Sequence, residues 1–170
     1  MLEQSNHITK AHRVVLSIGS NIGDLKRNIE QTLDLLSATD VLYDIHKSSF
    51  CLTEPYGYNT NHWFMNISVD AKTELDPFSL LFFLKSIEYQ FGRKKSDEIT
   101  DRIIDIDILF YDTISIDSKY LTLPHPRLHN RNFMLLPTNE ILPNLIHPTL
   151  NKTIETLSIN CEDSLRVIKQ

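Results

Sequence analysis

Apolar stretches separated by polar and turn-forming positions predict a sheet of several strands in this chain. Residues 14–18 form a mostly apolar run typical of a buried strand, and the Gly-Ser-Asn sequence at 19–21 predicts a turn directly after it. Residues 41–50 and 63–71 are rich in β-branched and aromatic side chains, which favours two further strands. Residues 51–62 contain the proline, glycine and asparagines of a loop.

Two segments place apolar residues at the spacing of an amphipathic helix. The first covers residues 24–38, and Asp24 suits its N-terminal cap. The second has sharper boundaries, because Asp76 suits the N-cap, Pro77 the first helical position and Gly92 the C-terminal cap. One helix is therefore expected after the first strand and another after the third.

Residues 102–111 predict a fourth strand, and it carries the most distinctive chemistry of the chain. Side chains alternate between the two faces of a strand, so one face is wholly apolar: Ile104, Ile106, Ile108 and Phe110. Asp105 and Asp107 lie on the other face, about 7 Å apart along the strand. Burying an unpaired carboxylate is costly, so this face must meet water, a cation or a polar site. Both a solvated sheet surface and a paired-carboxylate metal site fit this pattern.

The order strand, helix, strand, strand, helix, strand predicts an α+β fold with a ferredoxin-like βαββαβ core and a mostly antiparallel sheet. Beyond this core, residues 113–123 predict a short hairpin. Residues 127–142 predict a helix interrupted near Pro137, and residues 151–157 a further short helix.

Length and composition indicate an ordinary globular protein of one domain. The chain has 170 residues, of which 41% are hydrophobic and 23% charged. We expect a single domain over residues 13–170 after a flexible lead-in over residues 1–12. The net charge of −5 gives no general attraction to nucleic acid. No apolar run approaches the ~20 residues of a membrane span, and the two cysteines favour a reducing cytoplasm, so we expect a cytoplasmic protein.

Basic residues gather on both sides of the acid pair. Those before it are Arg93, Lys94, Lys95 and Arg102, and those after it are His125, Arg127, His129 and Arg131. Mg²⁺ commonly binds one or two carboxylates together with substrate phosphates, and the guanidinium group matches phosphate oxygens. Each cluster alone is compatible with a solvated surface, but their succession predicts a polyphosphate site. The glycine-rich loop of phosphate-loop NTPases is absent from the sequence.

The chain resembles the 6-hydroxymethyl-7,8-dihydropterin pyrophosphokinases of folate biosynthesis over residues 14–148. The motifs that carry the resemblance are Ser17-Ile18-Gly19-Ser20-Asn21, Phe64-x-Asn66, Glu88-x-x-x-Gly92-Arg93, Arg102-x-x-Asp105-x-Asp107-Ile108-Leu109, Pro124-His125-Pro126 and Arg131-x-Phe133. The resemblance implies transfer of pyrophosphate from ATP to the hydroxymethyl group of the pterin, with release of AMP. It also implies that the core is elaborated into a three-layer α-β-α sandwich.

The resemblance further implies a role for individual residues. Asp105 and Asp107 would bind two Mg²⁺ ions that bridge the triphosphate. The implied catalytic residues are Arg93, Lys95, Arg102, Asp105 and Asp107. The implied ATP-binding residues are Glu88, Arg93, Arg102, Ile108, His125 and Arg131. The implied pterin-binding residues are Thr53, Tyr56, Phe64, Asn66 and Phe133, with the two phenylalanines stacking on the ring.

This chain departs from the family pattern just before the acidic strand. Lys95 stands where well-known members have an arginine, and Thr100-Asp101 stands where they have Gly-Pro. Two other interpretations stay open: a ferredoxin-like module that binds or senses a small molecule without catalysis, and an ATP-dependent kinase for another heterocyclic alcohol. We expect a monomer that binds ATP and a reduced pterin, without nucleic acid or membrane partners.

Overall fold

The central sheet is antiparallel throughout in the computed structural model, which describes residues 10–55, 60–93 and 100–170. Its strands are β1 (His12–Ser20), β2 (Tyr43–Lys47), β3 (Cys51–Thr53), β4 (Phe64–Thr73), β5 (Asp105–Tyr111) and β10 (Val167–Lys169). The strand order is β10-β3-β4-β1-β5, and β2 pairs with β4 beside β3. The long strands β1 and β4 form its centre. This order confirms the predicted α+β, ferredoxin-like fold.

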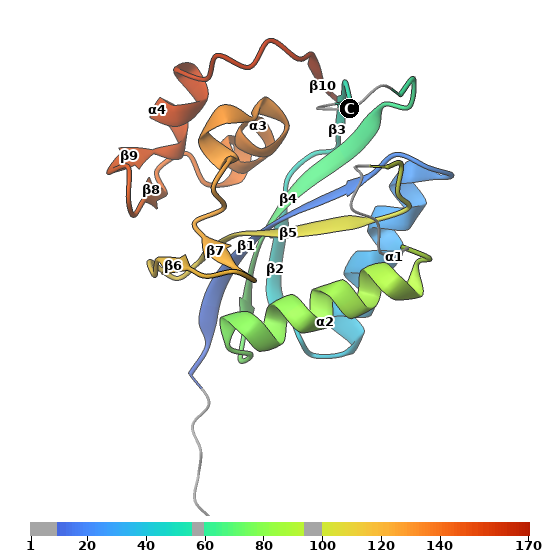
Figure 1. Cartoon of the computed structure of the whole chain (residues 1–170), viewed down its shortest axis with the longest axis horizontal. Coiled ribbons are helices and arrows are strands. Elements are labelled where there is room, and N and C mark those ends of the chain that lie inside the picture. The colour runs from blue at the N-terminus through green and yellow to red at the C-terminus, as the bar shows by residue number, and fades with distance from the viewer. Residues whose placement is uncertain (1–9, 56–59, 94–99) are drawn as a thin grey trace, which may run out of the picture.

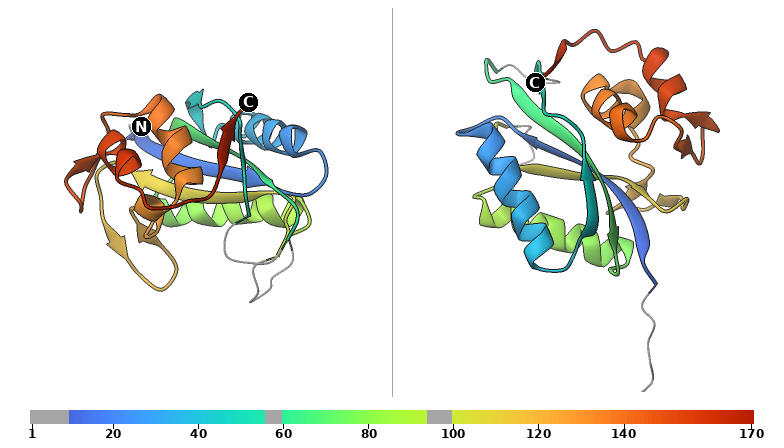
Figure 2. Two further views of the ribbon diagram at one scale, coloured as in Figure 1. Left: turned by 90° about the horizontal axis from the view of Figure 1, so that it is seen from above. Right: turned by 180° about the vertical axis from the view of Figure 1, so that it is seen from behind.

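Helices cover both faces of the sheet. The helices α1 (Leu25–Ala38) and α2 (Pro77–Gln90) lie on one face, while α3 (Asn132–Ile141) and α4 (Ile154–Ile159) lie on the other (Figures 1 and 2). Two separate apolar clusters result, one on each face. The first contains Leu16, Ile18, Ile29, Ile67 and Leu84, and the second contains Val15, Leu109, Met134, Leu135 and Leu157. The three-layer arrangement is therefore the predicted one.

The two central helices begin and end at the residues expected from the sequence. The Asp24 carboxylate accepts a hydrogen bond from the backbone amide of Arg27 at 3.1 Å. Asp76 accepts from the amides of Phe78 and Ser79, which would otherwise lack partners at the helix start. Gly92 follows α2 with a φ of 88°, a left-handed conformation that favours glycine.

The region between α1 and β4 differs from the prediction, which placed one strand at 41–50 and a loop from residue 51. Two short strands are present instead, and both pair with β4 at different heights. β2 pairs with its second half, near Val69–Lys72, and β3 pairs with its first half, near Phe64–Asn66. The ten residues of β4 are long enough for both. The prediction of a loop beginning at Cys51 is therefore wrong.

A bulge in β5 changes which side chains share a face. Val15 pairs with Phe110 and Leu16 with Ile108, so Leu109 is an extra residue between two successive pairs. Beyond the bulge the alternation is reversed, and Phe110 joins the second apolar cluster with Leu109. The prediction that Phe110 shares a face with Ile108 is wrong. The strand also begins at Asp105, three residues later than predicted.

The C-terminal third contains the expected hairpin and two elements that were not predicted. The hairpin is formed by β6 (Ile116–Asp117) and β7 (Thr122–Leu123). The helix α3 continues through Pro137, and the break in this region falls before it, at Arg131. The unpredicted elements are β10 and the small hairpin of β8 (Ile146–His147) and β9 (Lys152–Thr153). Across the described ranges, no helix has the length and apolarity to span a membrane.

Candidate active site

Antiparallel pairing places polar residues of three strands in adjacent rows at one end of the sheet. Asn66 on β4 pairs with Gly19 on β1, which in turn pairs with Asp105 on β5. Two residues further along each strand, Ser17 pairs with Asp107, and these side chains lie on the same face of the sheet. These side chains point to the face covered by α3, opposite the large apolar cluster. The acid pair and Asn66 therefore lie beside the same space.

Gly19 is part of β1, so the predicted turn at 19–21 is wrong for its first two residues. Glycine is needed at this position because the side-chain oxygen of Asn66 lies close to the Gly19 backbone, and a Cβ there would collide with it. The amide nitrogen of Asn66 donates to Thr53 Oγ1 at 2.7 Å, and both side chains are buried. Gly19 thus makes room for an asparagine that is held rigidly on the neighbouring strand.

A cavity of about 210 Å³ occupies the space beside these rows. Its lining includes these residues with a predicted role: Thr53, Phe64, Asn66, Arg93, Arg102, Asp105, Asp107, His125, Arg131 and Phe133. It also includes Arg127, a member of the predicted basic cluster, and three residues without a predicted role: Ser17, Gly19 and Glu54. Tyr56 and Lys95 lie outside the described residues. Four arginines converge here in a chain whose net charge is −5, so the cavity suits an anionic group.

The two carboxylates of the acid pair have different surroundings. Asp105 pairs with Arg93 Nη1 at 2.8 Å through one oxygen and with Arg102 Nη1 at 3.2 Å through the other. Arg102 Nε is buried, and within the described residues it has no hydrogen-bond partner. Both guanidinium groups are therefore held at the cavity. Arg102 Nε could still donate a hydrogen bond to a phosphate oxygen.

The negative charge of Asp107 is less well balanced by nearby positive charges than that of Asp105. Burial and the negative charge of Asp105 together raise the pKa of Asp107 to about 6, although the positive charges of Lys85 and Arg102 act in the opposite direction. A half-buried carboxylate that resists ionisation beside a second carboxylate suits a hard divalent cation, whose charge would stabilise both anions. The donor set on this strand face therefore fits Mg²⁺.

Glu88 lies behind the cavity and is not part of its lining. Its buried carboxylate accepts hydrogen bonds from Lys85 Nζ and from the backbone amide of Ile106, each at 2.7 Å, and also pairs with Arg93 Nη1. The structure therefore places Glu88 as a support for Arg93. Ile108 lines a neighbouring depression that extends toward the β6–β7 hairpin.

That neighbouring depression adjoins the cavity at two residues. Asp107 and His125 line both, while Lys85, Tyr120 and Ile108 line the depression alone. No sequence motif marked Lys85, because a lysine on a helix is usually solvated. Two adjacent spaces meeting at an aspartate can hold two substrates that react with each other.

Two aromatic rings line the cavity from opposite elements of the fold. Phe64 begins β4, and Phe133 belongs to the first turn of α3. The guanidinium carbon of Arg102 lies 5.8 Å from the centre of the Phe64 ring, and that of Arg131 lies 5.5 Å from the Phe133 ring. Each ring is thereby fixed beside a cation, and a flat heterocycle between them would meet two apolar faces.

His125 is held neutral at the junction of the two spaces. Burial, together with the positive charges of Arg131 and Arg127, lowers its pKa to about 4. Its Nδ1 accepts a hydrogen bond from the backbone amide of Arg127 at 3.3 Å. A neutral imidazole can still donate from its other nitrogen, which suits contact with a phosphate oxygen at neutral pH.

Replacing His125 is expected to flatten the dependence of stability on pH. The unfolded chain binds a proton at this residue below about pH 6.5, whereas the folded chain binds it only near pH 4. Its contribution to the free energy of unfolding is therefore complete above pH 6.5 and is lost as pH falls toward 4, by up to about 1.4 kcal/mol per pH unit. Denaturant unfolding of His125→Gln at several pH values measures this slope, with the exposed His46→Gln as control. Parallel curves for His125→Gln and the unmodified chain would contradict the assignment.

Carboxylates that suit a hard cation, next to convergent arginines, define a class of enzymes that transfer phosphate-containing groups. Comparison with known proteins narrows this class. The model of the 7,8-dihydro-6-hydroxymethylpterin-pyrophosphokinase (HPPK) family matches residues 15–143. The chain belongs to this family. The expectation of a diphosphotransferase of folate biosynthesis is thereby confirmed.

Individual relatives agree with the family assignment. The 2-amino-4-hydroxy-6-hydroxymethyldihydropteridine pyrophosphokinase of Methylorubrum extorquens is 37% identical over 134 residues, which cover 79% of this chain and 85% of that protein. The enzyme of the same name from Bacillus subtilis is 36% identical over 74% of this chain and 75% of its own length. The folic acid synthesis protein FOL1 of Dictyostelium discoideum is 36% identical over 93% of this chain, which spans only 24% of that protein.

Solved structures share the fold. The crystal structure of Plasmodium falciparum HPPK-DHPS with pteroate superposes with a TM-score of 0.71 over 88% of this chain and 42% of that one. The sequence identity is 22%, so this similarity concerns the fold alone.

Proposed function

We propose that this protein transfers the β,γ-diphosphate of ATP to the hydroxymethyl oxygen of 6-hydroxymethyl-7,8-dihydropterin and releases AMP. One observation carries the proposal: Asp107 lies where an aromatic-lined cavity meets a second depression, with Asp105 beside it. A flat heterocycle in the first space and a nucleotide in the second would bring the acceptor oxygen and the phosphates together at the acid pair.

The pterin occupies the cavity on the β4 side in this proposal. Phe64 and Phe133 stack on the two faces of the ring, and Thr53 and Asn66 hydrogen-bond its polar edge. The rigid pairing of Asn66 with Thr53 fixes the direction of both side chains, which favours one orientation of the ring. Tyr56, outside the described residues, is proposed to contribute to the same edge.

The nucleotide occupies the side formed by the arginines and the second depression. Arg93, Arg102 and Arg131 bind phosphate oxygens, and His125 donates from its neutral ring. Ile108 lies near the nucleoside. Glu88 acts on ATP through Arg93, whose guanidinium group it holds. Lys95, outside the described residues, is proposed as a further cation near the phosphates.

ATP-dependent transfer in this family implies Mg²⁺, and we propose two ions held by Asp105 and Asp107 with the phosphates. When bound, the ions would neutralise phosphate charge, and Asp105 and Asp107 would hold them at the junction of the two spaces. The hydroxymethyl oxygen bonds to the β-phosphorus while the bond from that phosphorus to the α,β-bridging oxygen breaks, so AMP leaves with that oxygen and the hydroxyl proton passes to solvent. The arginines stabilise the charge that develops on the leaving AMP and the transferred diphosphate.

Identification of the nucleotide product tests this proposal. The protein is incubated with ATP, Mg²⁺ and the reduced hydroxymethylpterin, and the nucleotides are separated by chromatography. We expect AMP to accumulate in proportion to the pterin supplied, and to disappear when pterin or Mg²⁺ is omitted. Pterin-dependent formation of ADP would show a simple kinase instead, and binding without turnover would show a non-catalytic module.

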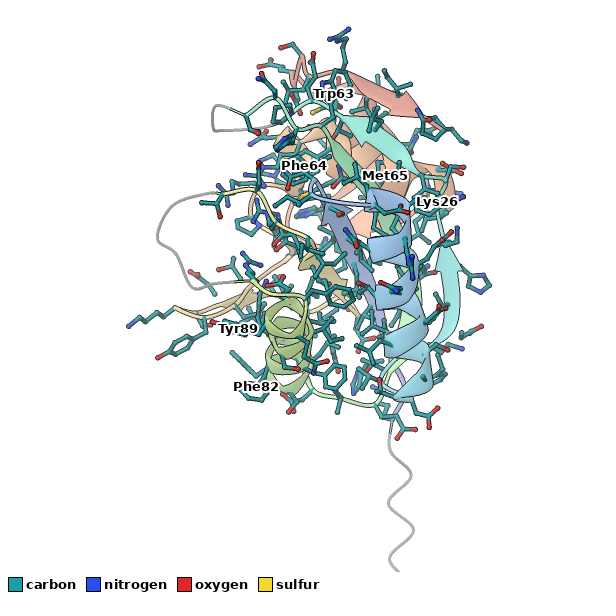
Figure 3. All side chains as sticks on the ribbon, turned by 90° about the vertical axis from the view of Figure 1, so that its right-hand side faces the viewer. Lys26, Trp63, Phe64, Met65, Phe82 and Tyr89 are labelled. Carbon is teal, nitrogen blue, oxygen red and sulfur yellow. The ribbon has the colours of Figure 1, made fainter. Side chains whose placement is uncertain are left out.

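Truncating either aromatic ring is expected to weaken pterin binding by about 1–3 kcal/mol, the range for stacking a base on an aromatic side chain. Phe64→Ala and Phe133→Ala should change nucleotide affinity much less, because Arg102 and Arg131 lie against the rings but bind phosphate through their guanidinium groups. Calorimetric titration with the pterin and with a non-hydrolysable ATP analogue measures both affinities. The control is Phe82→Ala, since Phe82 projects from α2 into solvent and is 79% exposed (Figure 3). If Phe133→Ala unfolded the chain or left pterin affinity intact, Phe133 would be a core residue.

We further propose that residues 13–170 act as one domain in a cytoplasmic monomer, with residues 1–12 as a lead-in. Cys51 and Cys161 are both free thiols, in keeping with a reducing compartment. Light scattering of the purified chain with and without Mg²⁺–ATP measures the oligomeric state.

A further inference from the structure

The carboxylate of Asp101 joins two segments that form different walls of the active-site cavity. One oxygen accepts a hydrogen bond from the side-chain amide of Asn21, just after β1, at 2.6 Å. The other lies 2.5 Å from His62 Nδ1 and 3.4 Å from the hydroxyl of Thr60, both just before β4. A side chain located four residues before Asp105 thus connects three parts of the chain that are distant in sequence.

Asn21 extends this connection to Arg102. The backbone amide of Arg102 donates to Asn21 Oδ1 at 2.7 Å, and the backbone amide of Asn21 donates to the carbonyl oxygen of Arg102 at 3.1 Å. The Asn21 side chain therefore donates to Asp101 and accepts from Arg102 at the same time. These bonds fix the backbone of the residue whose guanidinium group pairs with Asp105.

His62 extends the connection to the aromatic wall. It lies two residues before Phe64, and the guanidinium group of Arg102 lies over the Phe64 ring, 5.8 Å from its centre. The ring that is proposed to stack on the pterin and the arginine that is proposed to meet phosphate are therefore in contact. Asp101 bonds to the segments that carry each of them.

We propose that Asp101 is a positioning residue for diphosphate transfer, which couples the pterin-binding wall at the start of β4 to Arg102 just before β5. This inference rests on the proposed function. Asp101 does not line the cavity and acts through Asn21, His62 and Arg102. It stands where well-known members of the family have a proline, which has no side-chain acceptor and could not make these contacts.

Both carboxylate oxygens have a partner here: one accepts a hydrogen bond from Asn21, and the other lies 2.5 Å from His62 Nδ1 and accepts from it when that nitrogen carries the proton. Asparagine at this position offers one acceptor oxygen and no negative charge. Asp101→Asn therefore replaces the charge-assisted contact with Asn21 or with His62 by a weaker neutral one. We expect kcat/KM for the pterin to fall by about tenfold, the effect of one lost hydrogen bond to a charged group. Asp101→Glu keeps both acceptors and should recover part of the loss.

A double-mutant cycle with Asp101→Asn and His62→Ala tests the coupling, and Asp40→Asn provides a matched change at an exposed turn. If the two residues act together, the double variant loses no more kcat/KM than Asp101→Asn alone. The Asp40→Asn variant should keep the kinetics of the unmodified chain. Losses that multiply in the double variant, or an Asp101→Asn variant within twofold of the unmodified chain, would overturn the proposal.

Amide hydrogen exchange provides a second readout that does not depend on turnover. In Asp101→Asn, exchange should become faster both near His62 and at the amides of Asn21 and Arg102, while α1 and α2 stay unchanged. Unchanged exchange in either segment would overturn the inference, as would faster exchange throughout the chain. If the unmodified protein released no AMP, the proposed function would fail, and the exchange comparison would still decide whether Asp101 couples the two walls.

Discussion

Replacing Asp107 with asparagine is expected to reduce turnover by at least about a hundredfold, the effect of removing one preorganised electrostatic group from an active site. The change keeps the shape of the side chain and removes the anionic ligand that Mg²⁺ prefers. Asp107 also lies at the junction between the two substrate spaces, so the loss falls where the charge of the transferred group develops. Steady-state rates at saturating Mg²⁺, ATP and pterin measure the effect, with the exposed Asp34→Asn on α1 as control.

The same substitution is expected to raise the stability of the metal-free protein at neutral pH. Burial raises the pKa of Asp107 to about 6, so the folded state holds its proton more tightly than the unfolded state does. Ionisation between about pH 4 and pH 6 therefore costs stability, and the cost persists above pH 6. Asp107→Asn should melt at a higher temperature than the unmodified chain at pH 8, and this difference should shrink toward pH 4.

Asp105→Asn separates the two roles of the acid pair. It removes the same charge, but Asp105 forms ion pairs with Arg93 and Arg102, so this variant gains no stability from relief of repulsion alone. If both variants kept near-normal turnover, Asp105 and Asp107 would be part of a solvated sheet surface, and the assignment of a metal site would fail.

Replacing Glu88 with alanine is expected to destabilise the protein by about 3 kcal/mol, the cost of breaking a buried ion pair by removing one partner. The backbone amide of Ile106 would lose its acceptor inside the core, and Lys85 and Arg93 would lose the anion that they share. For a chain of this length the melting temperature should fall by roughly 6–12 °C.

Thermal unfolding of Glu88→Ala is compared with that of Glu30→Ala, which removes an exposed carboxylate 3.9 Å from Lys26 on α1. The control should stay within about 0.5 kcal/mol of the unmodified chain, as surface substitutions usually do. A loss of ATP affinity in Glu88→Ala without loss of stability would instead place Glu88 in direct contact with the nucleotide.

Capping and turn residues were enough to predict the helices whose two ends carry such residues. The helix α2 begins at Pro77 after the Asp76 cap and is followed by Gly92 at positive φ, as the sequence indicates. Features that depend on pairing between strands were not predictable in this way. The bulge at Leu109 exists only relative to β1, and β3 is stable because β4 offers it an edge. Period-two reasoning along one strand therefore assigned Phe110 to the wrong face.

The same holds for the candidate site: motifs predicted some of its residues, and strand pairing determines others. The residues named from motifs, such as Asp105, Asp107 and Phe133, are close together in the structure, although their individual roles stay proposals. Ser17 and Gly19 enter the lining because β1 lies between β4 and β5, a neighbourhood that the sequence does not state. Among the residues that support others, Glu88 belongs to a motif of the family, whereas Lys85, which donates to it, carries no local pattern of its own.

The position of the transferred phosphorus atoms tests the central claim most directly. The unmodified protein is mixed with Mg²⁺, ATP and 6-hydroxymethyl-7,8-dihydropterin, and the pterin product is examined by ³¹P NMR and mass spectrometry. The account predicts a pterin that carries two coupled phosphorus atoms, formed together with one equivalent of AMP and lost in Asp107→Asn. A pterin carrying a single phosphate, or a diphosphate ester formed equally fast by Asp107→Asn, would contradict it.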